Sequence, residues 1–494
     1  ENNMKQKKNS QNDCSFVTKL TYGLGEFPGT LIVSIINFLL MNFLTDYLKI
    51  DPIWAGVITF LGIVFDAITD PWAGYLSDNS TSKWGRRRSF MLKFTIPLGI
   101  SVLLLFCIPQ LFTQSSEFLK VLVVLVLYLL YILLITLYKT PYGAIASDLT
   151  KDYDTRTSLA AFRTTFIVIA TLASVIIPDL LGLSKITPSS GDAFFKMGLI
   201  MCILIIVFGL ISGFFVKEKN VEHTKQKYSF KKYFIDSLKI KPFRQVCFNF
   251  LFTNLCITTI NMALIYFLNY YVELPKLFTP IAGGVVILAM FFIPLFSKIC
   301  KVKSKNFTQN LAAICMIVGL VILIFIPRLG LSYQDGLTTV ETSMGASLKA
   351  FPWYAYIGVV LIAFGFGAFE MIPYSLMPDA IDFCIDKEHK DEGAYYGVVS
   401  FVFKVGKSLP SLFLGLILQI CQYQEPNFDE SLVNVVQTQS DLARFGIALV
   451  FIGLPILFAL ASILIMRKYN ITREKLTSQN QELQGGTNEN ENNV

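Results

Sequence analysis

Long apolar runs separated by short polar connections dominate the chain. The clearest, such as residues 121–137 and 197–215, are long enough with their flanks to cross ~30 Å of hydrocarbon as a helix at about 1.5 Å per residue. The first run continues through a full membrane thickness, so we expect this span itself to direct insertion instead of a cleavable signal. The pattern predicts about twelve spanning helices, near residues 20–47, 53–79, 90–111, 117–147, 158–182, 195–216, 244–272, 277–299, 306–327, 350–381, 393–421 and 440–466.

A polar, cationic stretch divides these runs into two sets of six. We expect an N-terminal six-helix bundle over residues 18–216, a basic cytoplasmic middle loop over 217–243, and a C-terminal bundle over 244–469. The polar ends, residues 1–17 and 470–494, are predicted to be disordered and cytoplasmic. This layout is typical of an all-α membrane protein with the major facilitator fold, in which two bundles flank a central cavity.

Composition and charge support a membrane location. Of the 494 residues, 53% are hydrophobic and only 16% are charged. The net charge of +7 comes from basic residues in short connections, which does not suit a nucleic-acid surface. By the positive-inside rule these connections and both termini are cytoplasmic, and the chain is a multi-pass protein of the cell membrane. The nine cysteines show no paired spacing and are interpreted as packing residues.

Ionisable residues inside the predicted spans are the first functional candidates. A charge within hydrocarbon is costly, so each such residue should have a partner or a role in transport. Six residues stand out: Glu26 in the first span, Asp66 and Asp70 in the second, Lys139 in the fourth, Glu370 in the tenth and Lys404 in the eleventh.

The second span carries the most informative group of these residues. Asp66, Thr69 and Asp70 share one helical flank because residues three and four apart lie one turn above each other. Carboxylate and hydroxyl oxygens suit a small alkali cation such as Na⁺, and two close carboxylates can bind a proton instead. Thr136 on the fourth span can add another oxygen. Alternatively, the two acids pair with Lys139 or with basic loop residues and only fix the packing of the helices.

The connection after the second span combines a glycine, an acid and a basic run. It contains Gly74, Asp78 and the basic run Arg86, Arg87 and Arg88. Glycine would allow close helix approach, and Asp78 can pair with the arginines. This connection resembles the signature loop between the second and third spans of major facilitator proteins, and the resemblance implies that such charge pairs close the cavity on the cytoplasmic side and break during transport. The alternative is a basic loop that only orients the helix in the membrane.

Several short motifs in a fixed order resemble one transporter family. The chain is similar to the glycoside-pentoside-hexuronide cation symporters, to which melibiose permease belongs, and more distantly to the sodium-dependent lysophospholipid transporters. The resemblance covers about residues 18–470. It rests on Tyr22-Gly-Leu-Gly-Glu-Phe27, Asp66-Ala-Ile-Thr-Asp-Pro71, Trp84-Gly-Arg86, Thr140-Pro-Tyr-Gly-Ala144, Phe403-Lys404 and the segment Pro373 to Asp382.

This resemblance implies roles for several residues. Asp66, Asp70 and Thr136 would bind the coupling cation, with Thr69 at a position where melibiose permease has asparagine. Lys404 would couple the cation site to the substrate site. The galactoside carriers use an acid in the first span and another in the fourth, where this chain has Thr30 and Lys139.

The substrate is therefore the least determined part of the prediction. A lysine only donates hydrogen bonds, so Lys139 does not replace a sugar-binding carboxylate. Lys139 would meet an anionic group of the substrate, or it would pair with Asp66, Asp70 or Glu370 and alter the cation site. Glu26 would line the cavity or pair with a basic loop residue such as Arg163. Glu370 and Tyr142 are further candidates for binding the substrate.

We expect a secondary active transporter that couples a Na⁺ or H⁺ gradient to the movement of a small solute. A sugar or glycoside is the leading cargo, a lysophospholipid or other amphiphile is the alternative, and an uncoupled facilitator is a third possibility. An enzyme is not expected, because His223 and His389 fall in predicted loops without a metal or acid-base cluster, and no cofactor is expected. The expected partners are the solute and the lipid bilayer, with no nucleic acid, and the protein is expected to act as a monomer.

Overall fold

The structure is a computed structural model of the chain, and it describes most of the predicted helical regions. Most of the predicted disordered tails and most of the predicted middle loop, residues 217–243, lie outside the described residues. Residues 15–17 of the predicted N-terminal tail are described, and Phe16 and Val17 are helical. The described residues are 15–149, 153–183, 190–216, 239–326, 332–334, 337–339, 351–384, 392–424, 435–436, 439–467 and 469.

The first half of the chain forms six long helical spans. The first span is composite, and π-helical turns make up its last part. Its segments, followed by the five other spans, are α2 (Phe16–Leu24), α3 (Glu26–Ile35), η1 (Ile36–Leu40) and η2 (Phe43–Tyr47), then α4 (Pro52–Asp78), α5 (Arg88–Cys107) with the short η3 (Ile108–Phe112), α6 (Glu117–Leu149), α7 (Tyr153–Leu180) and α8 (Ser190–Phe215).

The second half repeats this arrangement and adds three short strands. Its elements are α10 (Lys241–Tyr266) with η4 (Phe267–Tyr271), η5 (Pro275–Leu277) leading into α11 (Phe278–Val302), α12 (Lys305–Ile324), β1 (Ser332–Gln334), β2 (Leu337–Thr339), α14 (Trp353–Cys384), α15 (Glu392–Ile420), β3 (Val435–Val436), and a last span of α16 (Asp441–Ala448), η6 (Leu449–Gly453) and α17 (Leu454–Met466).

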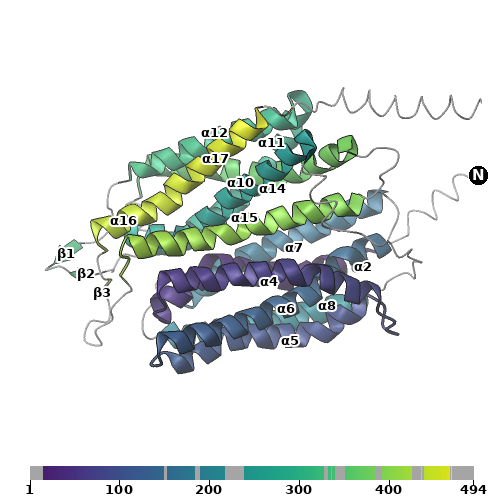
Figure 1. Ribbon diagram of the computed structural model, residues 1–494, viewed down its shortest axis with the longest axis horizontal. Coiled ribbons are helices and arrows are strands. Elements are labelled where there is room, and N and C mark those ends of the chain that lie inside the picture. Colours follow the sequence, from purple (N-terminus) through teal and green to yellow (C-terminus); the bar gives the residue numbers. More distant parts are fainter. Residues whose placement is uncertain are drawn as a thin grey trace, which may run out of the picture.

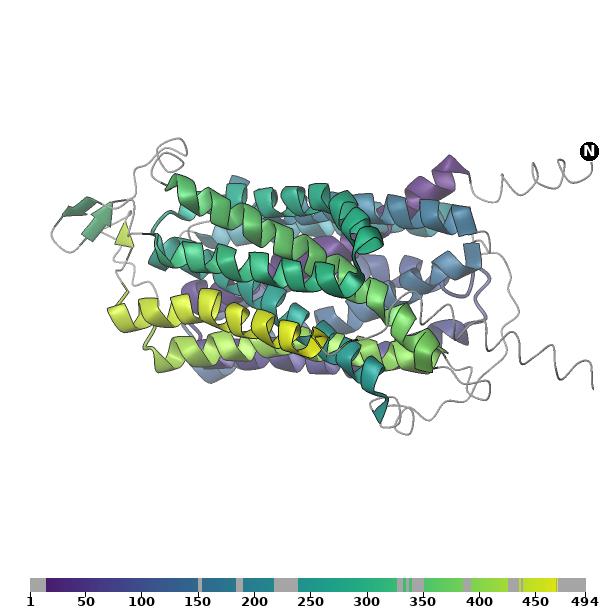
Figure 2. The same ribbon diagram turned by 90° about the horizontal axis from the view of Figure 1, so that it is seen from above.

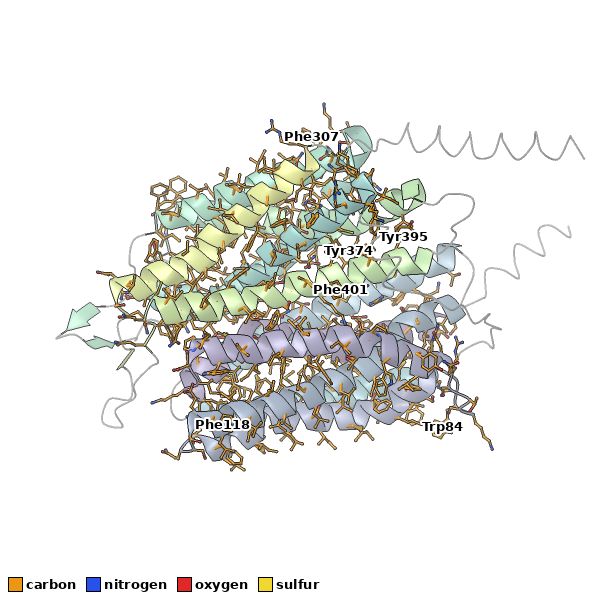
Figure 3. All side chains as sticks on the ribbon, in the orientation of Figure 1. Trp84, Phe118, Phe307, Tyr374, Tyr395 and Phe401 are labelled. Carbon is orange, nitrogen blue, oxygen red and sulfur yellow. The ribbon has the colours of Figure 1, made fainter. Side chains whose placement is uncertain are left out.

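Twelve helices within the described residues are long and apolar enough to cross a membrane, which confirms the predicted number of spans. The helices run along the long axis of the molecule in two groups (Figures 1 and 2). The strands pair antiparallel in the order β1-β2-β3 at one end of the molecule, a detail that the sequence reading did not predict. We call this end the strand end, and the opposite end, where Trp84 and Tyr395 lie, the terminus end (Figure 3).

Helix starts follow ordinary capping chemistry. The hydroxyl groups of Ser15, Ser304 and Ser440 each accept a hydrogen bond from the backbone N–H three residues later. Pro52 occupies the first position of α4, where a missing N–H costs nothing because no helical acceptor precedes it. These caps fix where the spans begin after their polar connections.

The two bundles touch along α4 and α15, which lie side by side in Figure 1, and also where α10 meets η1 and α11 meets α7. The α4–α15 contact is closest near the strand end. A Cβ atom on Gly56 would lie 2.7 Å from the carbonyl oxygen of Ser411, so only glycine allows the two helices to approach this closely.

Both halves end their first span in the same way. Residues 43–50 and 267–274 each contain a π-helical turn, and the chain then turns at a residue in the left-handed region, Lys49 with φ 53° and Glu273 with φ 66°. Left-handed geometry is uncommon for such residues, so its occurrence at both places marks an internal repeat. The offset between the two halves at this point is 224 residues, the separation of Lys49 from Glu273.

The outward surface is apolar along the spans and aromatic near their ends. Trp84 and Phe118 are 58% and 77% exposed and lie at opposite ends of the first bundle (Figure 3). Aromatic side chains are enriched where hydrocarbon meets the headgroup region. The line that joins these two residues therefore runs in the direction in which the bundle spans the bilayer.

Candidate functional site

Two acid-hydroxyl pairs join α4 to α6. The hydroxyl of Thr136 donates to Oδ1 of Asp66 at 2.7 Å, and the hydroxyl of Thr140 donates to Oδ1 of Asp70 at 3.0 Å. Both pairs have one-turn spacing on their own helices, so they form two successive rungs between the helices. Thr140 was not among the predicted cation ligands, although its spacing of four residues from Thr136 could have indicated it.

Lys404 of α15 reaches across the bundle interface to both acids. Its ammonium lies 2.8 Å from Oδ2 of Asp66, 2.5 Å from Oδ2 of Asp70, and 2.9 Å from the backbone oxygen of Asp66. The lysine side chain is 14% exposed. The ammonium therefore lies between two carboxylates and a carbonyl, and the structure brings the predicted residues Asp66, Asp70, Thr136 and Lys404 together.

The hydroxyl of Thr69 does not donate a hydrogen bond to the carboxylate of Asp66 or Asp70. Its hydroxyl donates to the backbone oxygens of Phe65 and Asp66, at 3.0 and 3.3 Å, within its own helix. The side chain is buried against the helix backbone. The hydrogen bonds to the carboxylates come instead from the threonines of α6.

Glu26 is the centre of a second charged group in the first bundle. Its side chain is 2% exposed and pairs with Nε of Arg163 at 2.7 Å, while the Thr30 hydroxyl donates to it at 3.1 Å. Arg163 was predicted to lie in a loop, but it belongs to α7. Lys139 lies 3.7 Å from the same carboxylate. The predicted pairing of Lys139 with Asp66, Asp70 or Glu370 is therefore wrong, since its ion pair is with Glu26.

Tyr142 lies in the core between the first span and α6. It is 1% exposed, its hydroxyl donates to the backbone oxygen of Tyr22 at 2.9 Å, and its ring stacks on the Tyr22 ring. The guanidinium of Arg163 lies over the Tyr142 ring at 5.7 Å. Tyr142 therefore supports the position of Arg163, and its hydroxyl does not face water.

The second bundle contributes Glu370 and Lys407, and the sequence reading had missed the lysine. The Glu370 side chain is exposed, and the Lys407 side chain is partly exposed, with its Nζ 4.3 Å from the centre of the Phe403 ring. Lys407 interacts electrostatically with Glu370 and, across the interface, with Asp66 and Lys139. Its spacing of three residues from Lys404 places both lysines on one flank of α15.

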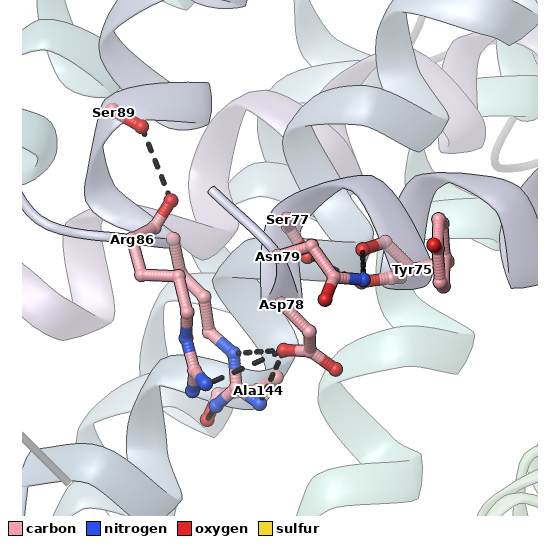
Figure 4. A network of polar contacts seen from close by, with 9 residues as sticks. Tyr75, Ser77, Asp78, Asn79, Arg86, Ser89 and Ala144 are labelled. Carbon is pink, nitrogen blue, oxygen red and sulfur yellow. Dashed lines mark hydrogen bonds and ion pairs between the residues drawn. The ribbon is translucent and has the colours of Figure 1, made fainter. Parts of the chain in front are cut away.

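The predicted gating loop forms a charge cluster at the terminus end (Figure 4). Arg87 donates to Oδ1 of Asp78 through Nε and Nη2, at 3.1 and 2.9 Å, and to the backbone oxygen of Ala144 at 2.6 Å. Arg86 lies 3.9 Å from the same carboxylate oxygen. Arg88 donates to the backbone of α8 at Gly213 and Phe214. These bonds connect α4, α6 and α8, all within the first bundle.

Gly74 was predicted to allow close approach of neighbouring helices, but its surroundings leave room for a Cβ atom. A Cβ atom at this position would meet only the methyl group of Thr140, at an ordinary distance of 3.8 Å. Close approach of α4 to its neighbours therefore does not require glycine here.

A buried polar cluster at the strand end was not predicted. Asp46 is 1% exposed and accepts hydrogen bonds from Asn42 and Thr45 of its own span. From the second bundle, Tyr270 donates to it at 2.7 Å and Tyr423 at 2.9 Å. We call this group the Asp46 cluster. Tyr270 is the residue 224 positions after Asp46, so equivalent positions of the two halves meet here.

The donor set between the bundles suits an alkali cation. Among the described residues no group of three or more His, Cys, Asp or Glu side chains could hold a metal ion, whereas Asp66, Asp70 and Thr136 offer hard oxygen atoms. These oxygen atoms face the Lys404 ammonium at the interface between the two bundles.

Comparison with known proteins gives related transporters. A family model described as MFS/sugar transport protein matches residues 21–473. The uncharacterized symporter sll1374 of Synechocystis sp. is 32% identical over 42% of this chain and 38% of its own length. Sodium-dependent lysophosphatidylcholine symporter 1 of Mus musculus is 23% identical over 97% and 90%, and the isoprimeverose transporter of Lactiplantibacillus pentosus is 24% identical over 82% and 80%.

Solved structures show the same fold. The nucleoside transporter NupG aligns over 91% of this chain and 98% of its own, with a TM-score of 0.62 and 12% identity. A D-xylose-proton symporter aligns over 92% and 97%, with a TM-score of 0.61 and 12% identity. At this identity the likeness concerns the path of the helices alone.

Proposed function

Because the chain belongs to the family of MFS/sugar transport proteins, and is therefore a multi-pass membrane transporter and not an enzyme, we propose that it is a cation-coupled symporter. The membership agrees with the predicted family and the predicted major facilitator fold. In the proposed cycle a cation binds at Asp66 and Asp70, and a small organic solute binds between the two bundles. Symport is the activity named for several relatives of the chain.

One observation carries this proposal, namely the position of the Lys404 ammonium between the two acids. A positive group from the second bundle neutralises acids of the first bundle, so a cation that displaces it changes the contact between the bundles. Binding energy is thereby linked to the relative position of the two bodies, as coupling requires. Carboxylate, carbonyl and hydroxyl oxygens favour Na⁺ as the cation, with H⁺ as the competing candidate.

We propose that the cargo is a small solute from one of two chemical classes. A sugar or glycoside is supported by the family description and by the isoprimeverose transporter. A lysophospholipid is supported by the alignment with the lysophosphatidylcholine symporter, which runs along nearly the whole chain. Both classes fit the same proposed cation site.

The test is tracer uptake into proteoliposomes with a panel of sugars and lysophospholipids, each with and without Na⁺. We expect saturable uptake of at least one compound that requires Na⁺. Asp66→Asn and Asp70→Asn should each abolish the Na⁺ dependence, because a neutral amide cannot balance the charge of a bound cation.

Asp192→Asn is the matched control. Asp192 is 70% exposed on α8 and pairs with Lys196, away from the bundle interface, so uptake should be unchanged. Direct binding of radioactive sodium to the purified variants separates lost cation binding from lost solute binding. Na⁺ binding that survives in both acid variants would overturn the proposed site, and uptake driven by a pH gradient instead would assign the site to H⁺.

A further inference from the structure

An open groove lies between α10 and α17 in the second bundle. It has a volume of about 410 Å³, within the range of roughly 300–1,000 Å³ that is usual for small-ligand sites. Phe243, in the first turn of α10, packs edge-on against Tyr395, which places the groove at the terminus end (Figure 3). The residues that line the groove are Lys241, Arg244, Gln245, Phe248, Leu464 and Ile465.

The groove opens on the outer surface of the bundle. Three successive residues of α10 show which neighbours surround this helix: Asn249 bonds to α17, Phe250 packs against α14, and Leu251 borders α15. Successive residues of a helix are about 100° apart, so Lys241 and Phe248 lie in the remaining sector, between the sides that face α17 and α15. This sector faces away from the α14 side of the helix, and its occupant meets the surrounding lipid.

Two basic side chains give the groove its positive charge. Lys241 and Arg244 are exposed, lie one turn apart on α10, and have no acid within 4 Å among the described residues. Lys239 and Arg467 are also exposed, and they come two residues before Lys241 and two after Ile465. The basic connections at this end are predicted to be cytoplasmic, and the cytoplasmic leaflet carries the anionic lipids of a membrane.

The apolar part of the groove lies deeper in the bilayer than the charges. Phe248 is 45% exposed and Leu464 is 61% exposed. Phe248 follows Lys241 by seven residues, which is a rise of about 10 Å along the helix. A phospholipid has the same arrangement, because its phosphate lies at the membrane surface and its acyl chains lie in the hydrocarbon. Basic pockets between spanning helices bind anionic headgroups in this way.

We propose that the groove binds one anionic glycerophospholipid, with its phosphate at Lys241 and Arg244 and an acyl chain along Phe248 and Leu464. Arginine and lysine donate charge-assisted hydrogen bonds to phosphate oxygens. A zwitterionic headgroup would bring its own ammonium group beside the same two cations, so it should bind less tightly. This lipid is a resident ligand and not the transported solute, and its site is separate from the proposed cation site.

The test measures lipid binding to delipidated, purified full-length protein by native mass spectrometry. The probes are phosphatidylglycerol and phosphatidylcholine with the same acyl chains, added at equal concentrations. We expect one molecule of phosphatidylglycerol to bind about tenfold more tightly than phosphatidylcholine. Glycerol 3-phosphate at the same concentration has the phosphate but no acyl chain, and it should not displace the lipid.

Variants assign the preference to the groove. The double variant Lys241→Gln, Arg244→Gln should lose the tenfold preference, whereas Lys241→Arg keeps the charge and should retain it. Phe248→Ser should weaken the binding of both lipids alike, because it removes an apolar contact with the acyl chain. Lys83→Gln is the control, since Lys83 is an exposed lysine beside Trp84 at the same end of the first bundle.

Three results would overturn the proposal. The first is no binding of phosphatidylglycerol, or equal affinity for the two lipids, in the wild-type protein. The second is displacement of the lipid by glycerol 3-phosphate, which would assign the groove to a soluble phosphate ester. The third is a preference that survives the double variant, or that falls equally in the control. The wild-type comparison decides even if a variant does not fold, and sodium binding, measured separately, tests the proposed function.

Discussion

At the scale of single residues, two threonines and one lysine contact the carboxylates of the acid pair of α4, Asp66 and Asp70. Thr136 and Thr140 each hold one carboxylate oxygen, and Lys404 holds the other oxygen of both acids. The threonines therefore fix the carboxylates on the first bundle, whether or not Lys404 is in place. In the proposed cation site, this fixed geometry would favour a cation of one size over others.

The first prediction concerns these threonines. Thr136→Val and Thr140→Val remove a hydrogen bond to a charged group but keep the shape, and each should weaken sodium binding by about tenfold, equivalent to about 1.4 kcal/mol. Binding of radioactive sodium to purified protein measures the effect. Thr164→Val, at an exposed position where the hydroxyl donates to its own helix backbone, is the control. Equal sodium affinity in all three variants would contradict the role of the hydrogen bonds from Thr136 and Thr140.

Sequence reasoning found part of this site and missed the rest for physical reasons. Asp66 and Asp70 are evident because two acids one turn apart within an apolar run are costly in the membrane and therefore require partners or a role in transport. Thr140 and Lys407 were missed because a threonine is unremarkable in a span, and because Lys407 follows Lys404 by only three residues. Which lysine meets which acid depends on how the two bundles dock, and no local pattern encodes that.

At the scale of elements, the ends of the first and seventh spans form a joint between the bundles. Both ends are π-helical, and the Asp46 cluster lies between them. π-Helical turns are rare and widen the helix, so they are often found at functional positions. Opening of the strand end must separate Asp46 from Tyr270 and Tyr423, and it would leave a carboxylate without its donors.

The second prediction tests this joint. Tyr270→Phe removes a donor to a buried carboxylate and should destabilise the closed strand end by about 2 kcal/mol. The reporter is Phe38→Cys in a background without native cysteines, since Phe38 packs edge-on against Phe278 of the second bundle. A membrane-impermeant maleimide added at the strand side should label the reporter faster in the variant.

Tyr75→Phe is the control for this experiment. Tyr75 is 69% exposed on α4, so its hydroxyl takes no part in closure and labelling should match the parent protein. Labelling that does not respond to Tyr270→Phe would show that the Asp46 cluster does not hold the strand end closed. This cluster could not be predicted from the sequence pattern, because Asp46 follows a long apolar run and resembles a charge at a loop boundary.

At the scale of the whole molecule, the two ends of the bundle interface differ in exposure. Asn42 and Asp46 near the strand end are at most 1% exposed, whereas Lys139, Asp70 and Tyr374 nearer the terminus end are between 37% and 46% exposed. The space between the bundles is thus sealed at the strand end and open toward the terminus end. Alternation between this state and its opposite is the expected transport movement.

A third prediction follows from this asymmetry. Tyr374→Cys should react with an impermeant maleimide applied from the terminus side, and Phe38→Cys should resist the same reagent from the strand side in the resting protein. Comparison of right-side-out and inside-out vesicles measures both. Rapid labelling of the Phe38→Cys variant from the strand side would show that the resting protein has the opposite orientation of its cavity.

The overall architecture was more predictable than the site. Twelve apolar runs and a polar middle segment are sufficient to indicate two six-helix bundles, because hydrocarbon thickness sets the length of each span. The docking of the bundles, the strands at residues 332–339 and 435–436, and the π-helical span ends depend on contacts between distant segments. These features therefore appear only in three dimensions.

The position of Lys404 also has a kinetic consequence. A carrier whose emptied site holds two bare carboxylates would cross the membrane reluctantly, and it would mainly exchange one loaded solute for another. The Lys404 ammonium lies between both acids. In the proposed cycle, this tethered ammonium would give the unloaded protein a return step of its own. In the proposed cycle, Lys404 is thus what turns an exchanger into a carrier capable of net accumulation.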